Sequence, residues 1–169
     1  MLAAHPMSPD RQLDPEALGD HLDRLYRAAR SLTGSREEAE DLVQETFVRV
    51  LRKPRILRSE DDLGYLLRVL RNTFISSRRT AARRPQTAGG PELLELVEDR
   101  RATRPDAQLE AGEVYAAIAA LPDDFRDAVV AIDVIGLSYR EAARALRVRE
   151  ATITTRLHRG RQRIARSLD

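Results

Sequence analysis

The chain of 169 residues contains no cysteine and no tryptophan. The absence of cysteine excludes disulfide scaffolds, cysteine-ligated zinc and thiol catalysis. No apolar run approaches the roughly 18 residues that a membrane-spanning helix needs, and the first ten residues, MLAAHPMSPD, are too polar for a signal peptide. We therefore expect a cytoplasmic protein that does not associate with membranes.

Glycine and proline are also scarce, with eight residues of each. Clusters of β-branched residues are few, whereas Ala, Leu, Arg and Glu, which favour helices, dominate the sequence. This composition predicts an all-α protein without strands. Because a chain of this length can form one ordinary domain or two small helical ones, the pattern of apolar residues has to decide between them.

Lysine is nearly absent as well, so arginine supplies almost all of the positive charge. The formal net charge of +2 hides a segregation along the chain. The segment 68–84 holds six arginines and no acid, and 137–169 holds nine arginines against three acids. The segment 37–45 instead holds five acids and no base. This segregation indicates two surfaces that face phosphates and a third that faces another partner.

Residues 14–84 show the pattern of one helical domain with three helices. The first begins at Asp14, before a proline, and ends at Gly34. Ser35 caps the second helix, and Ser59 opens the third, which runs to the arginines before 85. The apolar positions expected to share a core are Leu18, Leu22, Leu25, Tyr26, Ala29, Leu32, Ala39, Leu42, Val43, Phe47, Val50, Leu51, Leu63, Leu66, Leu67, Leu70 and Phe74.

The rest of the chain divides into a linker and a second helical domain. Residues 1–13 are expected to be a disordered lead-in, and 85–110, with its prolines, glycines and mixed charge, a flexible linker. The second domain covers 111–169. Its first two helices meet at Pro122, and the second ends at Gly136. Their expected apolar positions are Val114, Ile118, Leu121, Phe125, Val129, Ile132 and Ile135.

The last segment of the chain has the pattern of a helix-turn-helix. Ser138 and Glu141 have the spacing of a capping box, which predicts a short helix over 139–146. After a turn, a second helix begins near Arg149 or Glu150. The residues that lock the two helices together are Ala142, Ala143, Leu146, Val148, Ile153 and Leu157. From this pattern alone, a three-helix bundle that does not bind DNA stays open as an alternative.

Three segments resemble one known family. The segment LPDDFRDAVVAIDVIGLSYREAARALRVREATITTRLHRGRQRIARSL (121–168) resembles region 4 of extracytoplasmic-function sigma factors in the sigma-70 family, which reads the −35 promoter element. AEDLVQETFVRVLR (39–52) resembles region 2.1–2.2, and LGYLLRVLRNTFISSRRTAARRP (63–85) resembles regions 2.3–2.4, which recognise and open the −10 element. The segments follow the order and spacing of the family and, with their helices, cover roughly three-quarters of the chain.

The resemblance implies a fold, a function and partners. We expect a sigma region 2 bundle of three or four helices, joined by the linker to a sigma region 4 helix-turn-helix domain. The implied function is to bind core RNA polymerase, recognise both promoter elements and direct transcription initiation. The implied partners are the clamp of the largest core subunit, the flap of the second largest, promoter DNA and, for many relatives, an anti-sigma factor. Binding to polymerase places the protein at the nucleoid. No further C-terminal domain is expected, because the resemblance runs to 168.

The resemblance also implies site residues in region 2. Asp41, Gln44 and Glu45 fall where the family docks on the core clamp, and an acidic outer helix face suits such docking. Asn72 falls near the loop that captures an unstacked −10 base, although a surface Asn that bonds to water is the alternative. Tyr65 is a stacking residue or a core residue, and Leu67 stands where relatives often carry an aromatic ring. The full set expected at the −10 element is Tyr65, Arg68, Arg71, Asn72, Arg78 and Arg79.

In region 4, the outward residues of the recognition helix are expected to contact the −35 major groove. Thr155, Arg156 and His158 are assigned to bases and Arg149 and Arg159 to phosphates, with packing beside Leu157 as the alternative for His158. Two departures put the −35 preference in doubt: Arg147 stands where the turn usually has Gly, and Thr154 replaces a commonly basic residue. The full expected set is Arg149, Thr152, Thr154, Thr155, Arg156, His158 and Arg159.

Other chemistry is not indicated. The three histidines, His5, His21 and His158, are isolated and lack the spacing of metal ligands, so no metal is expected. No phosphate loop, dinucleotide fingerprint or nucleophile motif occurs, so we expect neither a cofactor nor an enzyme. Two functional alternatives stay open: a helix-turn-helix regulator that binds operators unaided, and a helical adaptor that binds only proteins. Copurification with core polymerase would separate all three.

Overall fold

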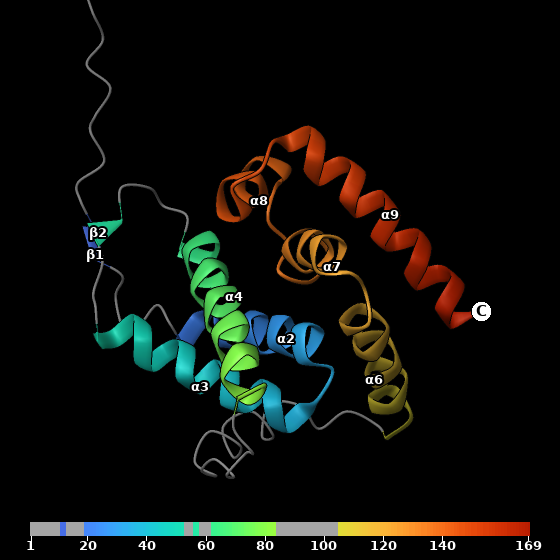
Figure 1. Cartoon of the computed structure of the whole chain (residues 1–169), viewed down its shortest axis with the longest axis horizontal. Coiled ribbons are helices and arrows are strands. Elements are labelled where there is room, and N and C mark those ends of the chain that lie inside the picture. Colours follow the sequence, from blue (N-terminus) through green and yellow to red (C-terminus); the bar gives the residue numbers. More distant parts are fainter. Residues whose placement is uncertain (1–10, 13–18, 53–55, 58–61, 84–104) are drawn as a thin grey trace, which may run out of the picture.

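The computed structural model describes residues 11–12, 19–52, 56–57, 62–83 and 105–169. The described part is helical apart from turns and two very short strands, which confirms the all-α class (Figure 1). The strands β1 (Arg11–Gln12) and β2 (Ile56–Leu57) pair antiparallel, a small departure from the expectation of no strands, because two short extended segments satisfy each other's backbone groups. Several predictions lie outside the described residues: the helix starts at Asp14 and Ser59, most of the lead-in, and 84–104 of the linker.

Three helices, each packed on the other two, form the first domain: α2 (Leu22–Thr33), α3 (Arg36–Arg52) and α4 (Asp62–Ala81). Leu25, Leu66 and Leu70 at their centre are fully buried. Burial of each such side chain contributes about 1.5–3 kcal/mol. The bundle thus confirms the core predicted for 14–84 at the described positions other than Leu51, and Leu18 lies outside the described residues.

The predicted boundary between α2 and α3 is confirmed in its details. Gly34 ends α2 in the left-handed conformation, with φ of 70°, and its N–H donates to the carbonyl of Arg30. Glycine adopts this conformation at no steric cost, which is why it ends so many helices. The hydroxyl of Ser35 then accepts the N–H of Glu38 at 3.4 Å and opens α3. The two helices are therefore joined by a tight turn.

The second domain contains α6 (Pro105–Ala119), α7 (Asp123–Val129), the single π-helical turn η1 (Val130–Val134), α8 (Tyr139–Leu146) and α9 (Glu150–Leu168). Pro122 separates α6 from α7, as predicted. The π turn that continues α7 was not predicted, because the apolar spacing of 125–135 fits an ordinary helix equally well. Gly136, with φ of 86°, ends this helix.

The helix-turn-helix of α8 and α9 confirms the sequence prediction closely. The Ser138 hydroxyl accepts the N–H of Glu141 at 3.1 Å, and the Glu141 carboxylate accepts the N–H of Ser138 at 2.7 Å. This reciprocal capping box starts α8 at the predicted residue. Ile153 and Leu157 of α9 are buried, at 0% and 2% exposed. They form the seam that fixes α9 against the rest of the domain.

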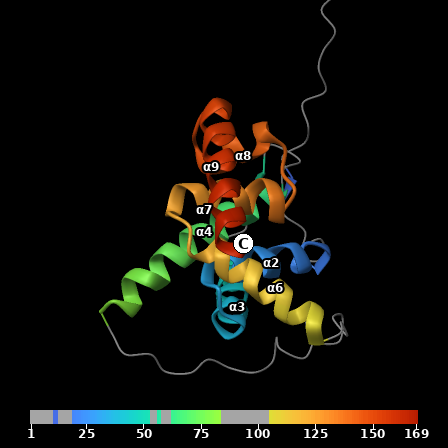
Figure 2. The ribbon, with the colours of Figure 1, turned by 90° about the vertical axis from the view of Figure 1, so that its right-hand side faces the viewer.

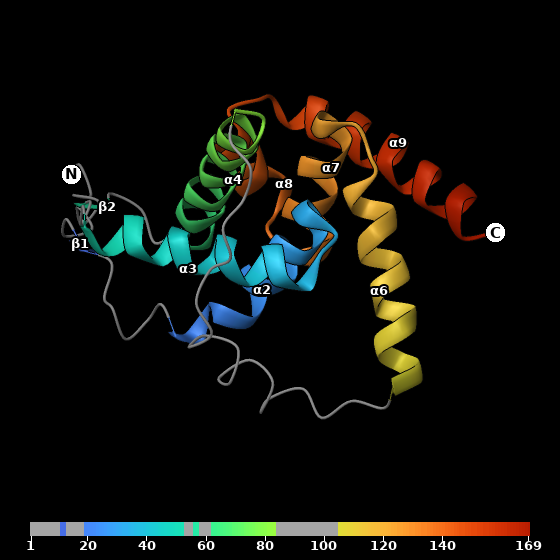
Figure 3. The same cartoon turned by 60° about the horizontal axis from the view of Figure 1, so that its bottom comes forward.

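The two domains pack against each other. Helix α2 lies on α6 and η1, and α4 lies on α8, an arrangement visible from two further directions (Figures 2 and 3). The approach is close at one point, where a Cβ placed on Gly34 would lie 3.1 Å from the Cβ of Ala119. The apolar core therefore continues from one domain into the other.

Two predicted core positions and one predicted boundary need correction. Leu51 is 54% exposed, because the adjacent Val50 takes the buried position at the end of α3. Val114 is 40% exposed, because α6 packs through its C-terminal half, where Ile118 is buried. The linker predicted for 85–110 ends earlier, since α6 begins at Pro105. Proline suits the first turn of a helix, and the residues that follow favour helix.

Candidate nucleic-acid and polymerase interface

Helix α9 presents one polar face to solvent. With Ile153 and Leu157 buried, the side chains between and beside them point outward. Most of the predicted −35 set lies on this face. The exposed members are Arg149, Thr154, Thr155, His158 and Arg159, and Thr152 is half-buried.

The two exposed threonines of this face have their hydroxyl protons engaged. The Thr154 hydroxyl donates to the carbonyl of Glu150 at 3.1 Å, and the Thr155 hydroxyl donates to that of Ala151, also at 3.1 Å. A hydroxyl that donates to its own helix still offers its oxygen as an acceptor, and its methyl group stays outward. Both threonines can therefore accept a base amino group or contact a thymine methyl.

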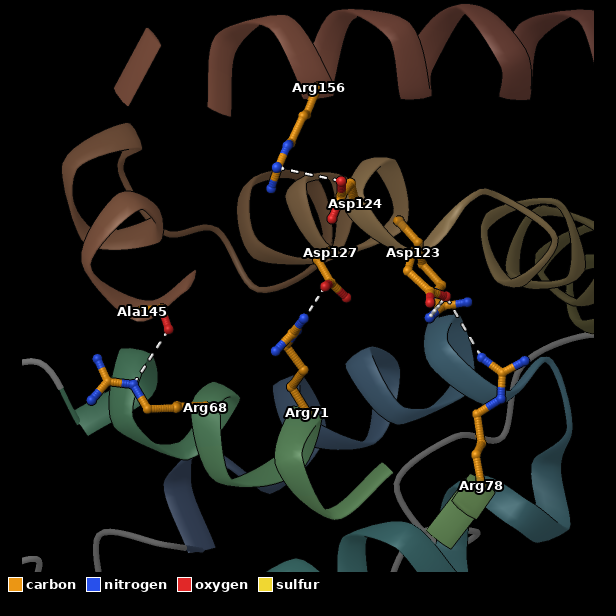
Figure 4. A network of polar contacts seen from close by, with 9 residues as sticks. Arg68, Arg71, Arg78, Asp123, Asp124, Asp127, Ala145 and Arg156 are labelled. Atoms are coloured by element: carbon orange, nitrogen blue, oxygen red, sulfur yellow. Dashed lines mark hydrogen bonds and ion pairs between the residues drawn. The ribbon is translucent and has the colours of Figure 1, made fainter. Parts of the chain in front are cut away.

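Arg156 departs from the rest of the predicted −35 set. Its side chain is 26% exposed, and its guanidinium lies 3.4 Å from the carboxylate of Asp124 on α7 (Figure 4). Arg156 therefore faces the start of α7, and part of its guanidinium is engaged by a protein carboxylate.

The turn between α8 and α9 contains the residue that the sequence marked as unusual. Arg147 has φ of 56°, the left-handed conformation, and in the described part of the chain it is the one residue other than glycine with positive φ. The N–H of Val148 donates to the carbonyl of Ala143 at 3.0 Å and closes the turn. The turn thus has the geometry that the family obtains with glycine, at the steric cost of a side chain.

Helix α4 carries the predicted −10 residues in two different states. Asn72, Arg78 and Arg79 are exposed. Tyr65 is half-buried and packs against the core, which fits the core alternative at least in part. Arg68 and Arg71 are also half-buried, but they make polar contacts with the second domain.

The contacts that Arg68 and Arg71 make with the second domain have defined acceptors. Arg68 donates to two carbonyls at the end of α8, those of Arg144 at 3.0 Å and Ala145 at 3.3 Å. Arg71 donates to the carboxylate of Asp127 on α7 at 2.6 Å (Figure 4). Two of the guanidinium groups predicted to face DNA therefore bind protein acceptors in this arrangement.

Asp127 is the most deeply placed carboxylate of this network, with a side chain 7% exposed. Burial raises the pKa of Asp127 above its ordinary value, since removal from water penalises the charged form. The hydrogen bond and the charge of Arg71, together with the charge of Arg126, oppose this rise, and Asp123 adds to it. Arg71 thus offsets part of the cost of burying the carboxylate.

Helix α3 presents the predicted polymerase-docking residues. Asp41 and Glu45 are exposed and Gln44 is half-buried, and all three lie on the side of α3 away from the core. Partial desolvation and then repulsion by Glu37 raise the pKa of Asp41. Glu45 forms an ion pair with Arg49 at 3.1 Å. An exposed acidic face of this kind suits a basic protein partner.

The same face ends in two exposed apolar side chains that the sequence analysis did not assign to it. Val48 is 37% exposed and Leu51 is 54% exposed. Their spacing from Gln44 places them on the same side of α3. The hydrophobic pattern suggested a buried Leu51, so the extension of this surface could be recognised only from the structure.

The acids of α7 were also missed by sequence reasoning. Asp123, Asp124 and Asp127 bind arginines of α4 and α9, and the pair Arg71–Asp127 is separated by 56 residues. No local pattern indicates a contact over such a separation. In the sequence, a short run of acids at the start of a helix is typical of favourable interaction with the helix dipole and indicates nothing more.

The described residues show no group of His, Asp and Glu side chains placed to hold a metal ion. Within the same residues, no helix has the length and apolar character needed to cross a membrane.

Comparison with known families identifies both halves of the chain. The model of Sigma-70 region 2 matches residues 18–84, and the model of Sigma-70, region 4 matches residues 111–164. The chain belongs to the sigma-70 family. The two matches cover the domain with α3 and α4 and the domain with the helix-turn-helix, in the order that the sequence resemblance implied.

Curated relatives place the chain among the ECF sigma factors of that family. SigE of Mycolicibacterium smegmatis is 39% identical over 153 residues, which are 88% of this chain and 59% of the relative. EcfG of Rhodopseudomonas palustris is 34% identical over 142 residues, 83% of this chain and 77% of the relative. SigM of Mycobacterium tuberculosis is 33% identical over 170 residues, 99% of this chain and 83% of the relative. All three are named ECF RNA polymerase sigma factors.

Solved structures show the same fold. The sigma factor RpoE in complex with the anti-sigma factor NepR from Bartonella quintana is 26% identical, with a TM-score of 0.67 over 90% of this chain and 94% of that one. CnrH in complex with the cytosolic domain of CnrY is 22% identical, with a TM-score of 0.65 over 91% of this chain and 86% of that one. The chain is therefore a sigma factor that recognises promoters and directs transcription initiation, a non-catalytic role.

Proposed function

We propose that this sigma factor docks on the clamp of core RNA polymerase through the outer face of α3. The proposed contacts are Asp41, Gln44 and Glu45, continued by the exposed side chains of Val48 and Leu51. An acidic patch speeds encounter with a basic partner, and the apolar end supplies area that gains from burial. The support is the combination of exposure, charge and family membership at this face.

We further propose that α4 reads the −10 element and α9 the −35 element, with region 4 also touching the flap of the second-largest core subunit. The observation that carries this assignment is the polar outer face of α9, whose hydrogen-bonding side chains surround a fully buried seam at Ile153 and Leu157. Phosphate contacts would set the register, and base contacts would give the sequence preference. Within this proposal the polymerase supplies all catalysis, and the sigma factor works in the cytoplasm at the nucleoid.

Run-off transcription tests the assignment as a whole. Purified chain and core polymerase on genomic fragments are expected to give discrete start sites, whereas core polymerase alone is not. Operator binding without polymerase and no run-off product would instead favour a stand-alone helix-turn-helix regulator.

The docking face has its own test, copurification of the chain with core polymerase. The variant Asp41→Ala/Gln44→Ala/Glu45→Ala is expected to keep its helical circular dichroism and to lose copurification, because it removes the polar centre of the face. The control Glu110→Ala/Glu113→Ala removes two exposed acids from another helix, α6. It is expected to copurify normally. Equal retention of both variants would refute the proposed docking face.

An anti-sigma factor is a second proposed partner. The support is that both similar solved structures were determined with a second protein bound, and that one of these proteins, NepR, is named an anti-sigma factor. Pull-down from the native host with the tagged chain, followed by a run-off assay with the captured protein added, would test it. Unchanged run-off with every captured protein would argue against an inhibitory partner.

A further inference from the structure

Three arginines of α4 have acceptors on the other domain. Arg68 binds the carbonyls at the end of α8, Arg71 binds Asp127, and Arg78 lies 3.6 Å from the carboxylate of Asp123 (Figure 4). All three arginines belong to the set proposed to face the −10 element. The second domain therefore occupies part of the face of α4 that DNA would use, while Asn72 and Arg79 of the same set stay exposed.

The contact is built as a packed interface. Phe74 of α4 is 8% exposed, and the guanidinium of Arg126 from α7 lies 5.2 Å from its ring centroid. Arg126 is itself 5% exposed and binds Asp123 at 2.6 Å. On the other side, Arg30 of α2 stacks over the ring of Tyr115 on α6 at 5.1 Å. A buried aromatic and guanidinium pair at one end and a half-buried pair at the other indicate one defined arrangement of the two domains.

The acceptors on the second domain have the chemistry of phosphate groups. Carboxylate and carbonyl oxygens accept guanidinium N–H groups in the geometry that phosphate oxygens use. The acids of α7 serve both DNA-reading helices, because Asp123 and Asp127 contact α4 and Asp124 contacts Arg156 of α9. The guanidinium N–H groups that donate to α7 or to the end of α8 are not available to a phosphate in this arrangement.

We propose that α7 and the end of α8 hold α4 in a closed, self-inhibited arrangement, in which protein acceptors take the places of promoter phosphates. The inference rests on the proposed role of α4 at the −10 element and adds its regulation. The two domains must separate before Arg68 and Arg71 can contact DNA. The apparent affinity for −10 DNA is then reduced by the fraction of molecules that are closed.

The first experiment measures closure without DNA or polymerase. Because the chain has no cysteine, Glu37→Cys on α3 and Arg166→Cys on α9 give two unique sites for spin labels, both exposed. Pulsed electron spin resonance is expected to show one dominant distance between the labels. Arg71→Gln removes the partner of the buried Asp127 carboxylate, so the open fraction is expected to rise by about tenfold or more.

The control for this variant is Arg79→Gln, which removes the same charge from an exposed position on the same helix. It is expected to leave the distance distribution unchanged. A broad distribution in the parent chain, or identical distributions for the two glutamine variants, would overturn the closed arrangement.

The second experiment locks the domains together at a point outside the arginine network. In Gly34→Cys/Ala119→Cys the two Cβ atoms are close enough for a disulfide after a small adjustment, and the strain of a side chain at the left-handed φ of 70° is the same in the oxidised, reduced and single-variant samples. The oxidised protein is expected to lose run-off transcription by about tenfold or more relative to the same sample after reduction. The single variant Gly34→Cys, treated with the same oxidant, is expected to transcribe equally before and after reduction.

Each result of the second experiment has a definite meaning. Failure of the two thiols to couple would overturn the closed arrangement, and equal transcription by the locked and reduced forms would overturn its inhibitory role. Absence of transcription from the reduced form and from the parent chain would refute the proposed function instead. In that case the distance measurement still decides whether the domains close.

Discussion

The two helices proposed to read DNA differ in how accessible they are. On α9, Thr154, Thr155, His158 and Arg159 are exposed, whereas Arg156 is held by the carboxylate of Asp124 and Arg161, outside the predicted −35 set, by that of Asp133. On α4, Arg68 and Arg71 are both engaged by the other domain. The sequence gives both helices the same arginine-rich character. The difference in accessibility between the two helices therefore comes from the arrangement of the domains. The amino-acid composition of a helix does not show whether its arginines are accessible to DNA.

The largest expected effect is on the stability of the domain that contains α9. Ile153→Ala removes a fully buried side chain from the seam of the helix-turn-helix, so the free energy of unfolding is expected to fall by about 2–5 kcal/mol. Ile164→Ala, at a half-buried position further along α9, is expected to cost less. Urea denaturation followed by circular dichroism measures both variants. Equal losses would show that Ile153 is not the anchor of α9.

A second prediction separates base reading from phosphate binding. Asn72→Ala on α4 is expected to weaken open-complex formation by about 1–3 kcal/mol, chiefly on the preferred −10 sequence, because a base contact is lost. Arg159→Ala on α9 is expected to weaken binding about equally on all sequences and to lower the salt slope by about 0.9, the value for one phosphate contact. Panels of −10 and −35 variants at several salt concentrations measure both. Sequence-independent loss for Asn72→Ala would remove it from the base readers.

A smaller effect is expected in the turn that precedes α9. Arg147→Gly relieves the left-handed strain of a side chain but gives the unfolded chain more freedom, so a net gain of about 0.5–1 kcal/mol is expected. The matched change Arg144→Gly lies inside α8 and is expected to cost about 1 kcal/mol. The midpoints of urea denaturation should therefore move in opposite directions. Movement in the same direction would contradict the role given to the turn.

The smallest expected effect is a pH dependence of the free energy of unfolding, because burial raises the pKa of Asp127 and the charges of Arg71 and Arg126 oppose only part of this rise. Since the pKa of Asp127 is raised in the folded chain, the folded chain binds the proton more tightly than the unfolded chain. The stabilisation that protonated Asp127 gives to the folded chain is complete below the ordinary pKa of 3.8. It is lost as pH rises through the raised pKa.

Urea denaturation of the parent chain, followed from pH 7 downward, measures this dependence. The contribution of Asp127 to the free energy of unfolding is expected to increase as pH falls toward the ordinary pKa. Asp127→Asn mimics the protonated side chain and corrects for the titration of the neighbouring Asp123 and of more distant acids. A parent chain and an Asn variant with parallel pH profiles would exclude Asp127 as the titrating group.

Much of the local structure could be predicted because its causes are local. Gly34, Ser35, Pro122 and the Ser138–Glu141 box each act within one turn of helix, and their positions fix the helix boundaries. The seam of α9 follows from residues four apart. The family resemblance added the assignment to sigma regions 2 and 4, which local patterns do not supply.

The relations between the domains could not be predicted in the same way. The contacts of Arg68 with α8 span more than seventy residues, with separations of 76 and 77. Such pairings depend on how two packed bodies meet, and no periodicity in the sequence records that. The exposure of Leu51 was not predicted for a related reason, since Val50 and Leu51 are adjacent apolar residues of α3 and only the packing of the helix shows that Val50 is the buried one. The assigned site residues stay predictions until the variants above are measured.

Gly160 of α9 has a consequence for exchanging promoter preference between sigma factors. A Cβ at this position would lie 2.7 Å from a methyl group of Val129 and 3.2 Å from the carbonyl of Phe125, so α9 seats directly on the backbone of α7. A recognition helix transplanted without its own α7 would meet a surface shaped for a different neighbour. The smallest transplantable unit therefore begins at Pro122, and a graft of α8 and α9 alone should fold poorly even when every base-contacting residue is correct.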